Sequence, residues 1–440
     1  RFAEPKLAKD VRVYNTYISD AANGNDHQIN THSDDFNSAL GHGGGYRLVY
    51  YKTATMLYNL QYVLGDSLFS DAMKHYVNQW KFAHPYFEDF RNSIIQYTKV
   101  DLNWFFDQWI ETTKGLDYGI GKVKKVKHTD SVDISINRVG EMQMPIDFTI
   151  TSKSGAKHSF HIPNSWFEKQ TDATILPRWI GWGKLQQTYT ARVHAPQGIK
   201  HIEIDTTLRL ADRNMLNNYR TANTLISPKK ILVKWDGGLY NPTDWKHYRL
   251  YFRPDVWYNA VDGIKLGMHF EGAYLHNFLK ADGSVWFNTQ LGQWSRFENS
   301  NAGNGVQKWL NYTLNLSTPL SRSMPNVTTF LNTRFLDGLW FHKLGAAWVI
   351  NASNYLQLSA QTFHRTQGSG DYLLYPNQWS SYSTNSNNSL NISYTRSYQY
   401  HRGFGYFTLS LRTPVLSNSF NYNYAELESV NTRLVHKLLV

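Results

Sequence analysis

The chain has 440 residues, no cysteine and a formal net charge of +11. Without cysteine it forms neither disulfides nor thiolate metal sites, so a bound metal would need His, Asp or Glu ligands. The basic residues are scattered and no groove-binding motif accompanies them, which argues against nucleic acid as a partner. At about 150 residues per domain, this length predicts about three domains.

The first domain, residues 1–118, is predicted to be helical, because apolar residues recur at helical spacing from Val49 to Ile110. A helix after Gly65 and Asp66 places five apolar residues on one face, which we expect to pack in the core: Phe69, Met73, Tyr76, Val77 and Trp80. A later helix, with Asp101 as its N-cap, presents a second apolar stripe: Leu102, Phe105, Phe106, Trp109 and Ile110.

The second domain, residues 119–225, is predicted to be a small antiparallel β-sandwich. The segments VDISINRV (132–139) and MPIDFTITSKSGAKHSFHIP (144–163) alternate between apolar and polar residues. The second segment breaks at a turn, Ser154-Gly155. The lysine-rich KVKKVKH (122–128) is typical of a solvated edge strand, since lysines discourage further pairing. We expect no chemistry from this domain.

The third domain, residues 226–440, is dominated by period-2 alternation, as in Ile264–Glu271, Leu310–Ser317, Leu356–Gln361 and Phe407–Arg412. A soluble sandwich alternates too, but residues 301–440 hold only 10 Lys+Arg and 4 Asp+Glu, few for a water-facing surface. Trp and Tyr also gather at the strand ends, as in the aromatic girdles of membrane barrels. We therefore predict an antiparallel transmembrane β-barrel of about ten strands, incomplete because the last strand lacks a closing partner.

Three polar, turn-rich segments are predicted to be barrel loops. They are KADGS (280–284), RFENSNAGNG (296–305) and QGSGDYLLYPNQWSSYSTNSNNS (367–389).

Three helical segments resemble, in order and spacing, the helical lobe of the gluzincin aminopeptidases, the kin of aminopeptidase N. They are VYYKTATML (49–57), GDSLFSDAMKHYVNQWKFAHPYFEDF (65–90) and DLNWFFDQWI (101–110). IDTTLRLADRNMLNN (204–218) looks like part of the small sandwich that follows the catalytic domain in that family. The resemblance covers about residues 40–115 and implies that residues 1–118 are the C-terminal part of a metallopeptidase catalytic domain.

The resemblance assigns one catalytic residue, Tyr50. In that family a tyrosine within V-Y-x-K-x-A donates a hydrogen bond to the oxyanion of the tetrahedral intermediate. Matched position by position, this tyrosine falls on Tyr50, and Tyr51 stands where the family often has glutamate. Without the resemblance, a tyrosine at a helix start would be interpreted as packing.

The zinc signature of the family, H-E-x-x-H, is absent, since none of the 17 histidines begins it. His27 and His32 in HQINTH lack the glutamate and are predicted to be surface histidines. Two explanations stay open: the zinc ligands lie upstream of Arg1, which we favour, or the lobe is a relic that serves as a binding surface. The family's GY-P turn is also replaced by TTKGLDYGI (112–120), so the cleft floor at residues 114–118 is expected to differ.

The segment WYNAVDGIKLGMHFEGAYL (257–275) looks like the opening of a BamA-like surface-antigen barrel. Together the resemblances imply an outer-membrane-anchored zinc metallopeptidase of a Gram-negative bacterium, with its lobe in the periplasm or at the cell surface. Its expected partners are a peptide or protein substrate, outer-membrane lipid and other outer-membrane proteins. One alternative is a catalytically inactive scaffold or accessory subunit of an outer-membrane export, insertion or uptake complex, and another is a wholly soluble multidomain peptidase.

Overall fold

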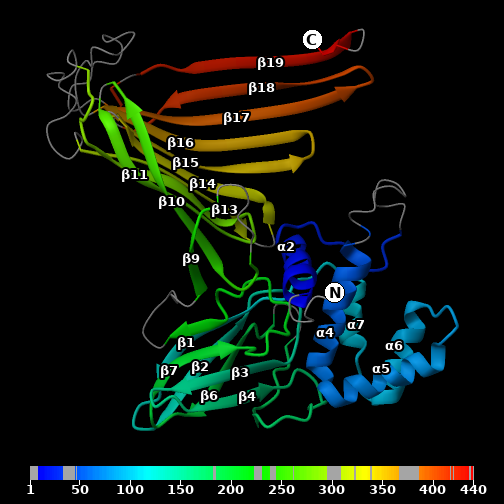
Figure 1. The fold of residues 1–440 in the computed structure, drawn as a ribbon. Coiled ribbons are helices and arrows are strands. Elements are labelled where there is room, and N and C mark those ends of the chain that lie inside the picture. The colour runs from blue at the N-terminus through cyan, green and yellow to red at the C-terminus, as the bar shows by residue number, and fades with distance from the viewer. Residues whose placement is uncertain are drawn as a thin grey trace. The chain divides into compact units, whose positions relative to one another are not determined.

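A computed structural model describes most of the chain. The described residues are 8–32, 45, 47–181, 185–221, 230–237, 244–260, 262–294, 309–321, 324–336, 339–365, 386–416, 418–419, 421–435 and 438–439. They belong to two compact units (Figure 1). The first unit comprises Arg1–Leu232 and Asp244–Tyr248, and the second comprises Val233–Thr243 and Arg249–Val440.

The first unit begins with helices. They are the π-helix η1 (Ala8–Tyr14), α2 (Asn15–Ala22), the π-helix η3 (Arg47–Lys52), α4 (Thr53–Leu64), α5 (Asp66–Trp80), α6 (Phe87–Thr98) and α7 (Asn103–Ile110). None of the described helices combines the length and apolarity needed to cross a membrane.

The apolar stripe predicted around α7 is confirmed, because all five of its side chains are at most 2% exposed. The predicted N-cap is wrong by one residue, because Leu102 holds that position; Asp101 precedes it, and its Oδ1 accepts the backbone N–H of Asn103, the first residue of α7, at 3.1 Å. The apolar spacing and the acidic start therefore specify this helix from the sequence alone.

The prediction that the apolar stripe of α5 packs in the core is wrong. Val77 is 55% exposed, and Phe69, Met73, Tyr76 and Trp80 are only half-buried. Helix α6 packs on part of α5, where the rings of Tyr76 and Phe90 meet edge to face at 4.9 Å. Apolar spacing predicts which face a helix would bury, but not how much of that face a neighbouring element covers.

Two small sheets follow in the first unit. One has the order β1 (Tyr118–Lys125), β2 (Ser131–Arg138), β6 (Thr188–His194); the other has the order β5 (Thr174–Ile175), β4 (Lys157–Ile162), β3 (Ile146–Ser152), β7 (Ile199–Ile204), β8 (Tyr219–Thr221). The predicted turn is confirmed, since Gly155 has φ +94° and its N–H donates to the carbonyl of Ser152 at 3.0 Å. The lysine-rich segment lies on β1, an edge strand as expected.

Helix α4 contacts the sheets through buried polar groups. Asn59 Oδ1 accepts the N–H of Ala211 at 3.2 Å, and the hydroxyl of Tyr62 accepts the N–H of Asp147 at 2.7 Å. The ammonium of Lys169 lies 3.9 Å from the centre of the Tyr62 ring. These contacts explain why the helices and the small sheets form one compact unit.

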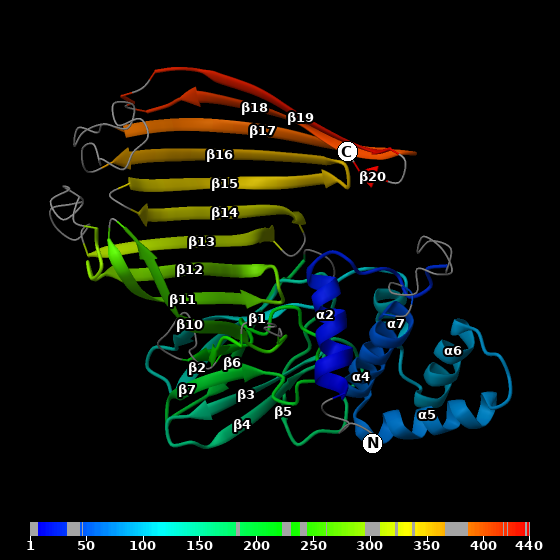
Figure 2. The ribbon, with the colours of Figure 1, turned by 45° about the horizontal axis from the view of Figure 1, so that its top comes forward.

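The second unit contains a twelve-stranded sheet whose strands follow one another in chain order from β9 to β20 (Figure 2). The strands are β9 (Ile231–Trp235), β10 (Tyr248–Asn259), β11 (Gly263–Tyr274), β12 (Phe278–Asn288), β13 (Leu310–Ser321), β14 (Met324–Leu336), β15 (Leu339–Asn351), β16 (Asn354–Arg365), β17 (Ser386–Tyr400), β18 (Gly403–Pro414), β19 (Tyr424–Val435) and β20 (Leu438–Leu439). Neighbours from β10 onward pair antiparallel.

The antiparallel strands predicted from alternation are thus confirmed, within a multidomain α+β architecture. On β16, Leu358 is 55% exposed whereas Ser359 is 2% exposed, as alternation requires. In the described part of the chain the sheet is not closed, since β9 and β20 stand at opposite ends of the strand order. A closed transmembrane barrel therefore stays a prediction.

One predicted loop is wrong. KADGS lies inside β12, where Asp282 pairs with Glu271 on one side and with Asn315 on the other. In the sequence, Gly283 suggests a turn, but in the structure it leaves room for the Phe270 ring. A Cβ at position 283 would lie 2.7 Å from that ring. Residues 386–389 of the third predicted loop begin β17, and the rest of that loop, like residues 296–305, lies outside the described residues.

Candidate active site

Tyr50, the tyrosine that the resemblance singles out, lies on the π-helix η3, directly before α4. Tyr50 is 58% exposed, Tyr51 is half-buried and Lys52 is 1% exposed. Residues two apart on a helix point in nearly opposite directions, so burial of Lys52 leaves Tyr50 facing outward. Single π-helical turns are often found at functional sites. Tyr50 is therefore placed where a substrate could reach it.

Lys52 holds this turn in place through three acceptors. Its ammonium lies 2.8 Å from Asp26 Oδ2, 2.5 Å from the His27 carbonyl and 3.2 Å from the Thr112 carbonyl. An ammonium has three N–H donors, so all of them are satisfied. The acceptors come from the segment after α2 and from the residues after α7. The Lys52 side chain thus joins η3 to the segment after α2 and to the segment after α7.

The Lys52–Asp26 pair is shielded from water, with side chains 2% and 6% exposed. Burial lowers the pKa of Lys52, although the charge of Asp26 opposes that change. Burial likewise raises the pKa of Asp26, against the attraction of Lys52. A buried pair of this kind is costly to break, because removing one partner leaves the other charge unpaired.

His27 and His32 are exposed, as predicted. The backbone N–H of His27 donates to Asp26 Oδ1 at 2.9 Å, so this segment supports Lys52. In the described ranges no three His, Cys, Asp or Glu side chains are grouped so that they could hold a metal ion. The described residues therefore do not fit a zinc site by themselves.

The predicted cleft floor, residues 114–118, contains a close packing contact. A Cβ on Gly115 would lie 2.0 Å from the guanidinium carbon of Arg213, so a side chain at position 115 would require this arginine to move. The guanidinium also lies 3.3 Å from the carboxylate of Glu141. This part of the chain is fixed to the small sheets.

Asp212 is a buried carboxylate that the sequence analysis did not single out. Its oxygens accept the N–H groups of Tyr118 at 2.9 Å and Asn214 at 2.7 Å, and the side-chain amide of Asn218 at 3.1 Å. Burial, with a smaller effect of the nearby Asp117 charge, raises the pKa of Asp212 to about 7. An Asn-rich turn such as LADRNMLNN resembles many exposed loops, so the sequence offers no signal of this burial.

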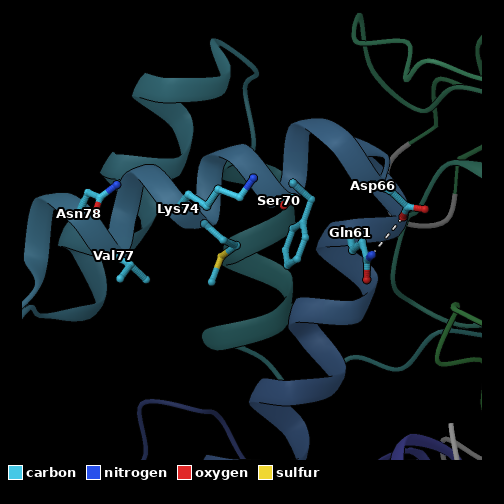
Figure 3. A pocket seen from close by; sticks show the side chains of 8 residues that line it. Gln61, Asp66, Ser70, Lys74, Val77 and Asn78 are labelled. Carbon is cyan, nitrogen blue, oxygen red and sulfur yellow. Dashed lines mark hydrogen bonds between the residues drawn. The ribbon is translucent and has the colours of Figure 1, made fainter. Parts of the chain in front are cut away.

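A hollow of about 520 Å³ lies over the exposed face of α5 (Figure 3). Phe69, Met73 and Val77 contribute apolar surface, and the rim includes Lys74. The amide of Gln61 donates to Asp66 Oδ1 at 3.0 Å, which links the end of α4 to the start of α5. The hollow exists because the predicted core face of α5 is incompletely covered.

Comparison with known families finds a match in the helical segment. Residues 7–109 match the Peptidase family M1 domain. No curated protein matches the chain. The matched residues contain Lys52 and the helices from η1 to α7 except Ile110, so the match covers the helical lobe described above. The match supports kinship of this segment with the M1, aminopeptidase N-type peptidases and a peptidase-related function.

Proposed function

We propose that residues 7–109 are the C-terminal part of the catalytic domain of an outer-membrane-anchored zinc metallopeptidase that hydrolyses peptide bonds. The observation that supports this proposal is the M1 match over the segment in which Tyr50 is exposed on an anchored turn. The hydrophobic face of the large sheet supports membrane anchoring, since Leu266, Met268 and Leu358 are each more than half exposed.

Tyr50 is proposed to donate its O–H to the oxygen on which negative charge develops. Such a donor is effective when it is already aimed before the charge appears. The three hydrogen bonds of Lys52 fix the backbone two residues away, which limits the movement of the turn. Exposure supplies access, and the anchor supplies preorganisation.

M1 peptidases are generally zinc-dependent, and zinc would activate water and polarise the peptide carbonyl. Because the described residues do not fit a zinc site, its ligands are proposed to lie upstream of this chain. A peptide or protein substrate and outer-membrane lipid are the proposed partners, with other outer-membrane proteins as further partners.

The proposal is tested by Tyr50→Phe in the intact protein. Loss of one oxyanion donor should lower turnover on the order of 10²-fold. Turnover is measured on a peptide substrate, and folding is checked by circular dichroism. Tyr51→Phe is the matched control, since it removes a hydroxyl from the neighbouring, half-buried ring. Equal turnover in Tyr50→Phe and the parent protein would contradict a role for Tyr50.

The second candidate is a catalytically inactive scaffold or accessory subunit of an outer-membrane export, insertion or uptake complex. It is favoured by the hollow over α5, since exposed apolar surface often marks a contact with another protein. For a scaffold, the intact protein would hydrolyse no peptide and retain no zinc after purification. Metal analysis of that protein separates the two candidates.

A further inference from the structure

A second pocket, of about 590 Å³, lies in the first unit, and Tyr50 is not among the residues that line it. Its walls come from the residues between α6 and α7, from the start of α7, from residues 164–167 and from residues 178 and 180. Its volume lies within the range of roughly 300–1,000 Å³ that is usual for small-molecule sites. We call it the Trp166 pocket.

An arginine and a tryptophan are stacked at this pocket. The guanidinium carbon of Arg178 lies 3.3 Å from the centre of the Trp166 ring, and this tryptophan is 84% exposed. A large indole at the surface gains little from burial, so its role here is to support the guanidinium from one face. Stacking of this kind leaves the edge of the planar guanidinium for a planar acceptor such as a carboxylate.

The positive charges of the pocket are not neutralised by the described residues. Arg178 forms no salt bridge with a described carboxylate, and its Nη1 is buried without a hydrogen-bond partner. Lys99, on the pocket wall, has no described acidic partner either. The indole N–H of Trp104 is a further buried donor that lacks an acceptor. Unpaired buried donors are costly, so such groups call for an explanation.

The one carboxylate on the pocket wall is already used. Asp101 Oδ1 accepts the backbone N–H of Asn103 at 3.1 Å and its side-chain amide at 2.9 Å. Its charge is therefore directed at the start of α7. Two cationic side chains, Arg178 and Lys99, against this one carboxylate leave the pocket wall with an excess of one positive charge.

Beside the polar residues Asn164 and Ser165, the pocket also has an apolar part. Ile180 is 57% exposed, and Val100 and Phe167 also line the wall. Apolar walls beside a few polar groups are the usual pattern of a site that orients an amphiphilic small molecule. A fitting ligand has an anionic group for Arg178 and an aromatic or aliphatic body for these side chains.

We propose that the Trp166 pocket binds a carboxylate attached to an apolar body. The carboxylate pairs with the guanidinium of Arg178, and the body lies against Ile180 and the indole of Trp166. The carboxylate belongs either to a free organic acid or to the C-terminus of a peptide. This site does not depend on the peptidase activity proposed above.

The test uses calorimetric titration of the full chain with two acids, 3-phenylpropionate and N-acetylphenylalanine, each compared with its neutral amide at constant ionic strength. We expect each acid that fits to bind on the order of 10-fold more tightly than its amide, because a charge-assisted pair is lost in the amide. Tighter binding of N-acetylphenylalanine indicates a peptide C-terminus as the ligand, and tighter binding of 3-phenylpropionate indicates a free acid.

Two variants locate the site. Arg178→Gln should weaken binding of the acid on the order of 10-fold and leave binding of the amide unchanged. Trp166→Ala should weaken binding of both, and because this side chain is exposed, the fold should be retained. Lys157→Gln, which removes an exposed charge from β4, is the control. The proposal is overturned if neither acid binds, if acid and amide bind equally, or if Lys157→Gln weakens binding as much as Arg178→Gln.

Discussion

At the scale of single residues, the Lys52 ammonium is the structural centre of the helical lobe. Lys52→Met would leave the Asp26 carboxylate buried without the counter-charge of Lys52 and would remove one hydrogen bond from each of two carbonyl groups. We expect a loss of about 3–5 kcal/mol in the free energy of unfolding, measured by urea denaturation. The control Lys74→Met breaks the exposed pair with Asp71 and should cost about 0–1 kcal/mol. Equal costs would contradict this role.

The sequence motif points to Tyr50 as a catalytic candidate, a prediction still untested, but gives no sign of the structural role of Lys52. Tyr50 belongs to a short continuous motif, so a resemblance can assign it without knowledge of the fold. The partners of Lys52 lie 26 residues before it and 60 residues after it. Only the folded chain brings such distant groups together. Most lysines are exposed, and one is almost never fully buried unless it is paired. The sequence does not show the pairing partner, so a buried lysine cannot be told from a surface lysine.

At the scale of elements, Asp212 connects the turn before β8 to the first residue of β1, Tyr118. Its pKa is raised to about 7 in the folded protein, against about 3.9 in an unfolded chain. Between about pH 4 and 7 the folded protein therefore holds a proton that the unfolded chain has lost. This group makes the free energy of unfolding decrease as the pH rises through that range.

Asp212→Asn removes this titration. We expect the variant to be less stable than the parent, because an amide cannot accept all three N–H donors. The stability difference should be largest near pH 4 and shrink toward pH 7, as measured by urea denaturation at several pH values. In the control Asp133→Asn, which breaks an exposed pair with Arg192, the difference in the free energy of unfolding from the parent should not shrink between pH 4 and 7. A difference independent of pH in Asp212→Asn would refute the raised pKa.

Elements were predicted well where local spacing decides burial. The α7 stripe is continuous and entirely buried, so spacing sufficed. The α5 stripe has the same spacing, but its burial depends on α6, which packs on only part of it. The loop predicted at KADGS is wrong for a related reason: an Asp-Gly pair favours a turn locally, but distant parts of the chain decide the structure. Pairing with β11 and β13 on both sides keeps these residues extended.

At the scale of the whole molecule, alternation predicted the strands of the large sheet but could not establish closure. Period 2 assigns each side chain to one face, and this property is the same in an open sheet and in a closed one. Closure depends on pairing between the first and last strands, which are separated by the whole unit. Alternation likewise does not tell whether the apolar face of the sheet contacts lipid or water, and this question needs a direct test.

Leu358→Arg supplies that test. If the apolar face of β16 contacts lipid, arginine there should destabilise the protein by about 2–4 kcal/mol in detergent or lipid, most at the middle of the bilayer. If that face contacts water, replacing a leucine that is 55% exposed should change stability by no more than about 0.5 kcal/mol. Gln357→Arg is the control on the other face of the same strand, where a lumen-facing arginine is tolerated and the cross-strand partners Ala347 and Ser393 are uncharged. Urea unfolding of both variants in lipid vesicles therefore decides between a membrane-anchored and a wholly soluble protein.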